Sequence, residues 1–268
     1  MSKPLLHFAH GNSYPAGTYN RLLQQLRAHY DVRTLDMHGH DPRHPVGDGW
    51  GALVDELIEH LEGYGAPAVL VGHSLGGVLC MLAARRRPEL ARCVVMLDSP
   101  VVAGWRALGW RLAKLAGWGE RLSPARFARK RRDLWPSRAA AHAHFSAKPL
   151  FQAWAPGALD DYLEHGLAPH PQGVTLRFKR DVETAIYQTL PHDMDAVIQE
   201  PFPVPIGFIA GTRSQEMRQA GMEATRKLVG ENLAMIEGGH LYPLEKPQET
   251  ARLIHAMVAR LLAAPTRP

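Results

Sequence analysis

The sequence predicts an α/β protein with a mostly parallel six-stranded sheet flanked by helices, and with a helical segment inserted after the fourth strand. Short apolar runs rich in β-branched residues alternate with stretches of helical periodicity, which is typical of parallel sheets. This alternation stops near residue 100 and resumes near residue 200. We therefore expect a core domain formed by 1–100 and 201–268, and a helical cap formed by 101–200.

The elements of the core follow one another with short connections. Leu22, Leu23 and Leu26 recur at helical spacing after the first apolar run, and Leu53, Val54 and Leu57 do so after the second. Continuous apolar runs without alternation are typical of strands covered on both faces. The expected strands are 5–9, 32–35, 68–71, 93–97, 205–211 and 233–237, and the expected helices are 16–29, 48–61, 75–87, 215–229 and 247–262.

The inserted segment differs from the core in composition. It carries five of the six tryptophans and several short helix candidates separated by prolines. We expect most of these tryptophans to form the interior of the cap, with one or two lining a pocket. The segment from Trp105 to Arg138 holds ten Lys or Arg residues against Glu120 and Asp133, in a chain of net charge +5. A solvated helix surface is the main explanation, and the basic run 126–132 could alternatively bind an anionic substrate or an acidic partner.

Composition limits the possible classes of protein. The chain has 268 residues, 46% hydrophobic and 21% charged, as expected for one globular core with an insertion. No apolar run reaches the roughly 20 residues that span a bilayer, and the N-terminal stretch lacks a secretory signal pattern.

Cys80 and Cys93 fall in core elements, so we expect free thiols and a cytoplasmic location. No nucleic-acid-binding motif is present, and we expect a small-molecule substrate, no nucleic-acid partner and no stable membrane association. The oligomeric state is not predicted.

One serine stands where the third strand turns into a helix. The segment Gly72-His73-Ser74-Leu75-Gly76 follows a buried strand and opens a helical run. A tight turn at this point brings the backbone at both glycines into close contact, so a Cβ there would clash. The turn leaves the Ser74 hydroxyl exposed at the carboxyl edge of the sheet, close to the amide groups of the new helix.

Other polar residues fall at the same edge of the predicted sheet. His10-Gly11-Asn12, Asp98 and His240 each follow a strand, and ligands gather at the carboxyl ends of strands in such sheets. A serine hydroxyl needs a neighbouring base to become a good nucleophile, and histidine suits that task near neutral pH. His240 is the candidate base because Gly238-Gly239-His240 lies directly after the last strand.

Three motifs give the chain a resemblance to the α/β-hydrolase-fold serine hydrolases, of the esterase and lipase type with a helical cap. They are His10-Gly11-Asn12, Gly72-His73-Ser74-Leu75-Gly76-Gly77 and Gly239-His240, in the order typical of that family. The resemblance implies the family's fold without its two N-terminal strands. It also implies Ser74 as nucleophile, His240 as general base and then acid, and an oxyanion hole made by the backbone amides of Asn12 and Leu75.

The acidic residue of a catalytic triad departs from the common pattern. In the family that this chain resembles, the acidic residue usually follows the strand after the cap. At that place this chain has Gly211-Thr212-Arg213-Ser214. Two carboxylates could replace it. Asp98 ends the preceding strand, and Glu216 lies two residues beyond Ser214. We prefer Asp98 because the sheet determines its position, although it could instead cap a loop or helix, and Glu216 could be an exposed first-turn residue.

The sequence most directly predicts hydrolysis of a small or medium carboxylic ester through an acyl-serine intermediate. The same residues would also permit hydrolysis of a thioester or a C–C bond, or an elimination, and a non-catalytic ligand-binding protein is the alternative of a different class. His38, His40 and His44 form a cluster in a proline-rich loop without the spacing of a zinc site. We expect no metal and no organic cofactor.

Overall fold

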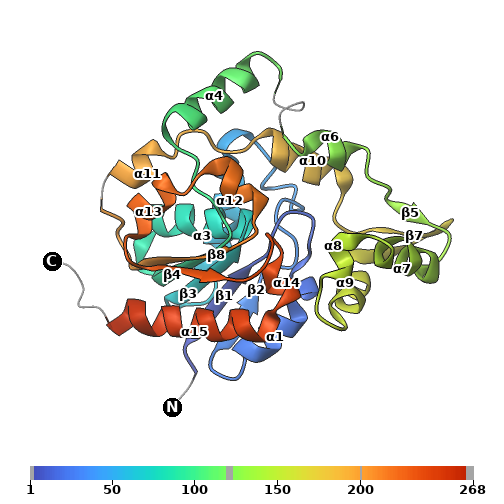
Figure 1. Cartoon of the computed structure of the whole chain (residues 1–268), viewed down its shortest axis with the longest axis horizontal. Coiled ribbons are helices and arrows are strands. Elements are labelled where there is room, and N and C mark those ends of the chain that lie inside the picture. The colour runs from blue at the N-terminus through green and yellow to red at the C-terminus, as the bar shows by residue number, and fades with distance from the viewer. Residues whose placement is uncertain (1–2, 119–122, 200, 264–268) are drawn as a thin grey trace.

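A six-stranded sheet with all neighbouring strands parallel forms the centre of the protein (Figure 1). The computed structural model describes residues 3–118, 123–199 and 201–263. The strand order is β2-β1-β3-β4-β8-β9, which confirms the predicted fold class. The strands are β1 (Leu5–Ala9), β2 (Asp31–Thr34), β3 (Ala68–His73), β4 (Ala91–Leu97), β8 (Ile206–Gly211) and β9 (Leu233–Ile236).

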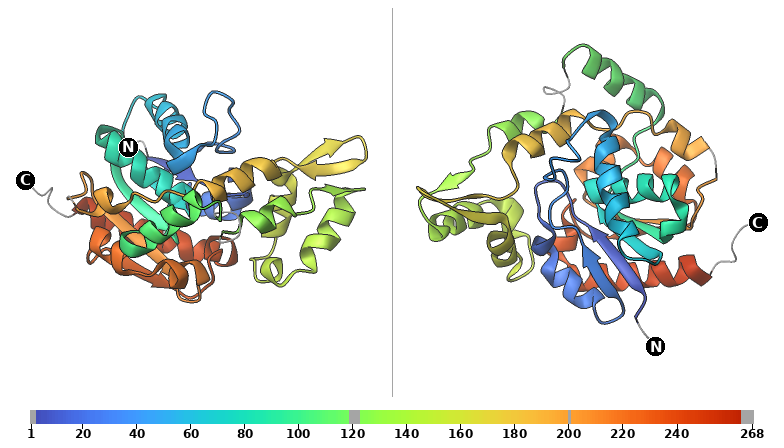
Figure 2. Two further views of the ribbon diagram at one scale, coloured as in Figure 1. Left: turned by 90° about the horizontal axis from the view of Figure 1, so that it is seen from above. Right: turned by 180° about the vertical axis from the view of Figure 1, so that it is seen from behind.

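Alternate residues of the central strands face two separate apolar layers. Val69 and Val71 of β3 belong to one buried cluster, whereas Ala68 and Leu70 belong to the other. Burial of every residue of β3 explains its continuous apolar sequence. The first layer contains residues of α1 (Asn20–Leu26) and α15 (Pro247–Ala263). The second contains residues of α2 (Gly51–Glu62), α3 (Leu75–Arg86), α12 (Gln215–Ala220) and α13 (Glu223–Val229), so helices cover both faces of the sheet (Figures 1 and 2).

The register of the strands brings three loops together at one edge. Ala9 of β1 lies opposite Gly72 of β3, and His73 lies opposite Leu97 of β4. The chain therefore leaves these three neighbouring strands at the same level, directly before His10, Ser74 and Asp98. Parallel pairing is what makes this convergence possible, because every strand then ends on the same side.

Three expected helices are interrupted. The first begins as a 3-10 turn, η1 (Ala16–Tyr19), and its α-helical part ends at Leu26 rather than residue 29. The helix expected over 215–229 divides into α12 and α13 at Gly221, whose φ of 79° an α-helix does not allow. The helix expected over 48–61 begins as a 3-10 turn, η2 (Asp48–Trp50), and Gly49 and Trp50 have positive φ before α2 starts at Gly51. A further 3-10 turn, η3 (Pro88–Leu90), precedes β4.

The inserted segment contains strands as well as helices. A small antiparallel sheet of order β5-β7-β6 lies to one side of the main sheet (Figure 2). The sequence analysis missed these strands because each has only two to four residues and Pro169 interrupts the β6 pattern. The elements of the insertion are α4 (Gly104–Leu115), α6 (Ala125–Arg129), β5 (Leu134–Trp135), α7 (Arg138–Ser146), α8 (Pro149–Gln152), α9 (Ala158–Gly166), β6 (Leu167–His170), β7 (Gly173–Leu176), α10 (Arg180–Gln188) and α11 (Asp195–Gln199).

The tryptophans of the insertion have two different environments. Trp135 and Trp154 are buried in the same apolar cluster as α1 and α15, as expected for interior residues. Trp105 and Trp118 are 75% and 58% exposed, so the expectation of a mainly interior role is wrong for these two. Cys80 and Cys93 are buried free thiols, which confirms their prediction as core residues. Among the residues described, no helix combines the length and the apolar character needed to cross a bilayer.

Candidate active site

Ser74 occupies a strained turn between a strand and a helix. β3 ends at His73 and α3 begins at Leu75, and Ser74 between them has φ 53° and ψ −117°. Its backbone N–H donates to the Leu97 carbonyl at 2.9 Å, which holds the turn against β4. A Cβ at Gly72 would overlap the carbonyl group of Gly76, and one at Gly76 would overlap that of Ala9. The two glycines are therefore required by close backbone approach, as the sequence predicts.

His240 connects Ser74 to Asp98. The Ser74 hydroxyl lies 3.1 Å from Nε2 of His240, and Nδ1 of His240 lies 2.7 Å from Oδ2 of Asp98. With the proton on Nδ1, the imidazole donates to the carboxylate and accepts from the hydroxyl. Such a chain of contacts can move a proton away from a serine oxygen.

Asp98 accepts hydrogen bonds from β8, the strand beside its own, and from the loop after β8. Its side chain is fully buried, and its Oδ1 accepts a hydrogen bond of 2.7 Å from the Gly211 backbone N–H. Oδ2 accepts a second one from the Ser214 hydroxyl, in addition to its contact with His240. Ser214 thus stands in the position where the sequence pattern led us to seek an acid, and it contacts the carboxylate that β4 supplies.

Glu216 lies farther from the imidazole than Asp98 does. Its Oε2 is 3.9 Å from Nδ1 of His240, beyond hydrogen-bonding distance, and its side chain is 48% exposed. The structure therefore places Asp98, and not Glu216, in hydrogen-bond contact with the histidine. The carboxylate of Glu216 still acts on His240 through its charge.

The pKa of His240 is raised above its ordinary value of 6.5 by opposing effects. Burial lowers this pKa, because it disfavours the charged imidazolium. The hydrogen bond that His240 donates to Asp98 and the negative charges of Glu216, Asp98 and Glu245 raise it more. The imidazole is consequently a stronger base than a free histidine, and it is surrounded by carboxylates that favour its protonated form.

Two backbone amides near Ser74 have no partner among the residues that the structure describes. Within the described part of the chain, the N–H groups of Asn12 and Leu75 donate no hydrogen bond to another residue. Leu75 is the first residue of α3, and Asn12 lies on the β1 loop that lines the same pocket as Ser74. The Asn12 side chain points elsewhere, because its Nδ2 donates to the Glu183 carbonyl at 3.2 Å. Asn12 lines the pocket, and Leu75 directly follows Ser74 in the chain.

A buried network that the sequence analysis missed joins the β1 loop to the His240 loop. The Tyr19 hydroxyl accepts from the Gly11 N–H at 3.2 Å and contacts Nδ1 of His73 at 2.7 Å. Nε2 of His73 lies 2.9 Å from the backbone carbonyl of His240. Burial, together with the charge of His240, lowers the pKa of His73, so the ring is neutral and its Nε2–H donates to that carbonyl. The position of His73 next to Ser74 was the only sequence signal for this role.

A pocket of about 250 Å³ opens beside Ser74 and His240. Its lining includes the β1 loop and residues of the insertion, among them Leu150 and Tyr187. Arg131 also lines it and donates from Nη1 to both carboxylate oxygens of Glu183, at 2.9 and 3.1 Å. We expected the basic run 126–132 to be mainly a solvated surface, but Arg131 is mostly buried and paired. The wall of the pocket therefore combines aromatic and apolar side chains with one buried ion pair.

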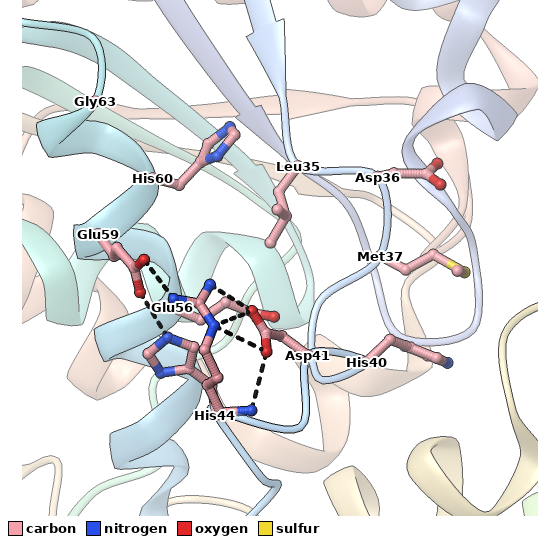
Figure 3. A pocket seen from close by; sticks show the side chains of 11 residues that line it. Leu35, Asp36, Met37, His40, Asp41, His44, Glu56, Glu59, His60 and Gly63 are labelled. Carbon is pink, nitrogen blue, oxygen red and sulfur yellow. Dashed lines mark hydrogen bonds and ion pairs between the residues drawn. The ribbon is translucent and has the colours of Figure 1, made fainter.

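A larger pocket of about 430 Å³ lies elsewhere, between α2 and the loop after β2 (Figure 3). Three of its charged groups already pair with one another. Arg43 contacts Asp41 at 2.7 Å and Glu59 at 2.8 Å, and His44 contacts Glu59 at 2.8 Å. It holds no serine or cysteine nucleophile. This surface network explains His44, and the buried His38 lies 3.4 Å from Glu56 in a structural contact.

One group of side chains has the spacing of metal ligands. In the described residues, atoms of Asp98, Glu216 and His240 lie within 4.8 Å of one another. Nδ1 of His240 donates its proton to Asp98, however, so it has no lone pair for a cation in this arrangement. The hydrogen bonds already explain the cluster.

The site and the sheet define a class of protein, and comparison with known families agrees. The model of the alpha/beta hydrolase family matches residues 8–253, so the chain belongs to that family. The crystal structure of E-2-(acetamidomethylene)succinate hydrolase is similar, with a TM-score of 0.76, 20% identity, and coverage of 96% of this chain and 92% of that one.

Three curated relatives illustrate the similarity in sequence. Ethanol acetyltransferase 1 of Wickerhamomyces anomalus is 23% identical over 268 residues, which cover 92% of this chain but only 66% of that protein. The pimeloyl-[acyl-carrier protein] methyl ester esterase of Xanthomonas campestris pv. campestris is 23% identical over 273 residues, or 96% of each chain. The alignment with the esterase of that name from Xylella fastidiosa spans 97 residues, 37% of that protein.

Proposed function

We propose that this protein is a serine hydrolase that cleaves a small or medium carboxylic ester through an acyl-serine intermediate. The observation that carries the proposal is the hydrogen-bonded chain from Asp98 through His240 to Ser74, at the edge of a pocket. A buried carboxylate, an imidazole and a hydroxyl in this order have the contacts that nucleophilic catalysis by serine requires.

In the first half of the reaction, Ser74 is the nucleophile and His240 the general base. Nε2 of His240 takes the hydroxyl proton as Oγ of Ser74 bonds to the ester carbonyl carbon. Asp98 accepts the hydrogen bond from Nδ1 and stabilises the imidazolium that forms. The free amides of Asn12 and Leu75 would donate to the carbonyl oxygen as it becomes negative, forming the oxyanion hole.

Departure of the alcohol completes the first half of the reaction, and the second half repeats these roles with water. The tetrahedral intermediate collapses, the bond to the alkoxy group breaks, and His240 gives its proton to the leaving alcohol. Water then attacks the acyl-serine while His240 takes one of its protons. The second tetrahedral intermediate collapses as its bond to Oγ of Ser74 breaks, and His240 returns the proton to Oγ, which restores the hydroxyl and releases the carboxylic acid.

The insertion supplies the substrate pocket in this proposal. We propose that residues 101–200 act as a cap over the core, because Arg131, Leu150, Glu183 and Tyr187 line the pocket. A volume of about 250 Å³ suits a small or medium acyl group. The names of the similar esterase and acetyltransferase agree with acyl chemistry. The two free thiols suit a reducing compartment such as the cytoplasm.

A series of p-nitrophenyl esters with acyl chains of increasing length tests the function. The wild-type protein should hydrolyse the shorter esters, with kcat/KM falling once the chain exceeds the pocket, and Ser74→Ala should reduce the rate to background. Asn20→Ala, a change on α1 outside the pocket lining, is the control and should retain activity. Hydrolysis that is equal in Ser74→Ala, or binding of esters without turnover by the wild type, would contradict the proposal and favour a ligand-binding protein.

A further inference from the structure

Helix α4 presents an apolar face to solvent. Six of the nine large apolar side chains that are exposed among the described residues lie between 105 and 127. Four of them are on α4: Trp105 (75% exposed), Leu108 (55%), Leu112 (57%) and Leu115 (77%). At 100° per residue these four positions fall within an arc of about 80°, so they form one stripe along the helix. Trp118 (58% exposed) continues it beyond the helix, and Phe127 (66%) is on α6.

The orientation of this stripe is determined by contacts on the opposite side of α4. Nε1 of Trp110 donates to the Leu190 carbonyl at 3.2 Å, and Nζ of Lys114 donates to the same oxygen at 3.0 Å and pairs with Asp48. The Gly104 N–H donates to Asp195 at 2.9 Å. The polar contacts of α4 thus face the protein while its apolar stripe faces outward, the reverse of an ordinary surface helix.

Basic side chains accompany the apolar stripe. From 101 to 132 the sequence has nine Lys or Arg residues and one acidic residue, Glu120. Arg111, Arg126 and Lys130 are exposed, and no acidic side chain of the described residues pairs with them. The guanidinium groups of Arg106 and Arg126 lie over the rings of Trp105 and Phe127, at 4.8 and 4.5 Å from their centroids. Figure 1 shows α4 and α6 along one margin of the molecule.

We propose that α4 and α6 form a binding surface for membranes that contain anionic phospholipids. Leucine and tryptophan side chains of an exposed helix enter the boundary between headgroups and acyl chains, and flanking Arg and Lys attract anionic headgroups. Tryptophans at both ends of the stripe suit this boundary, which is apolar on one side and wet on the other. A second copy of the chain fits this surface less well, because self-association would bring its unpaired basic residues together.

The proposed contact is reversible and peripheral. It needs no helix that crosses the bilayer, and it would hold the protein where ester substrates with apolar chains accumulate. It revises the expectation from the sequence, which was that the protein has no stable membrane association. The binding itself does not depend on hydrolysis, so it stands or falls separately from the proposed function.

Flotation with vesicles tests the surface. The wild-type protein should float with vesicles of phosphatidylcholine mixed with phosphatidylglycerol, less with phosphatidylcholine alone, and less as the salt concentration rises. The variant Leu108→Ser/Leu112→Ser/Leu115→Ser should lose at least about ten-fold in partitioning, because it removes most of the buried apolar contact. Met235→Ser/Leu262→Ser changes exposed apolar residues on β9 and α15 and is the matched control.

A double charge-reversal variant tests whether the basic side chains contribute to binding of anionic vesicles. Arg111→Glu/Lys130→Glu should weaken binding to the mixed vesicles, whereas Arg252→Glu on α15 should not. Far-UV circular dichroism and the melting temperature of each variant check that the fold is kept. The proposal would be overturned by no flotation of the wild type, by equal flotation of the leucine variant, or by a dimer that the leucine variant dissociates while vesicles remain unbound. Binding to a soluble polyanion such as polyglutamate in place of vesicles would also overturn it, in favour of an acidic protein partner.

Discussion

The Ser214 hydroxyl donates a hydrogen bond to Oδ2 of Asp98, the same oxygen that contacts Nδ1 of His240. Ser214 lies on the loop after β8, whereas Asp98 follows β4, so the two residues come from neighbouring strands. Ser214 also accepts from the Met217 N–H at 3.2 Å and caps α12. A serine at this position thus supports a carboxylate that arrives from the adjacent strand.

Replacing Asp98 should cause a large loss of catalysis. Asp98→Asn keeps the shape of the side chain but cannot stabilise the imidazolium, so kcat should fall by about 10³- to 10⁴-fold while the melting transition stays cooperative. Glu216→Gln is the control, because its carboxylate is 3.9 Å from His240 and makes no hydrogen bond to it. Steady-state kinetics on a p-nitrophenyl ester distinguishes the two. A larger loss in Glu216→Gln than in Asp98→Asn would reverse the assignment.

Removing the Ser214 hydroxyl should have a smaller effect. In Ser214→Ala the Asp98 carboxylate keeps its contacts with Gly211 and His240, so kcat/KM should fall by roughly ten-fold, the effect of one hydrogen bond to a charged group. Loss of the helix cap should also lower the free energy of unfolding by about 1 kcal/mol. Thr212→Ala, an exposed change on the same loop, should alter neither quantity. Urea denaturation with kinetics on the same samples measures both, and wild-type values in Ser214→Ala would mean that the hydroxyl is dispensable.

The pH profile should respond to the carboxylates around His240. The base must be neutral to accept a proton, and its pKa is raised above 6.5, so kcat/KM should decline on the acid side with a midpoint above pH 6.5. Glu216→Gln/Glu245→Gln removes two negative charges that favour the imidazolium, which lowers this pKa and moves the acid limb to lower pH. The exposed Glu231→Gln is the control. An acid limb that does not move would show that the two charges do not act on His240.

The Tyr19 hydroxyl should matter for both stability and rate. Tyr19→Phe leaves the Gly11 N–H and Nδ1 of His73 buried without partners, which costs about 1–3 kcal/mol of unfolding free energy. We expect kcat/KM to fall as well, because these bonds join the Asn12 loop to the His240 backbone. Tyr162→Phe is a close control, since the buried hydroxyl of Tyr162 has no partner within the described residues. Equal losses of stability and activity in Tyr19→Phe and Tyr162→Phe would contradict the role of the Tyr19 hydrogen bonds.

The parts of the molecule that local patterns determine were predictable. Each residue of β3 is buried, and Gly72 is required by backbone contact with Gly76, four residues on, whereas Gly76 is required by contact with Ala9 of the neighbouring strand β1. The six parallel strands follow from such patterns, and so does the presence of His10, Ser74, Asp98 and His240 at one edge of the sheet.

What depends on distant contacts was not predictable. The distances of Asp98 and Glu216 to His240 depend on how three separate loops pack, so the sequence alone left both carboxylates open. The burial of Arg131 depends on its pairing with Glu183, 52 positions away, which no local pattern indicates. The outward orientation of Trp105 follows from contacts on the other side of α4, and the helical spacing of its apolar residues alone suggests burial.

Above all, we propose that Ser74 is a nucleophile activated by His240. Incubation with a fluorophosphonate probe, followed by peptide mass spectrometry, tests it most directly, because the probe bonds covalently to an activated serine oxygen. We expect one adduct, on the peptide that contains Ser74, with slow labelling in His240→Ala and none in Ser74→Ala. An unlabelled wild-type protein, or labelling that persists in Ser74→Ala, would contradict the account.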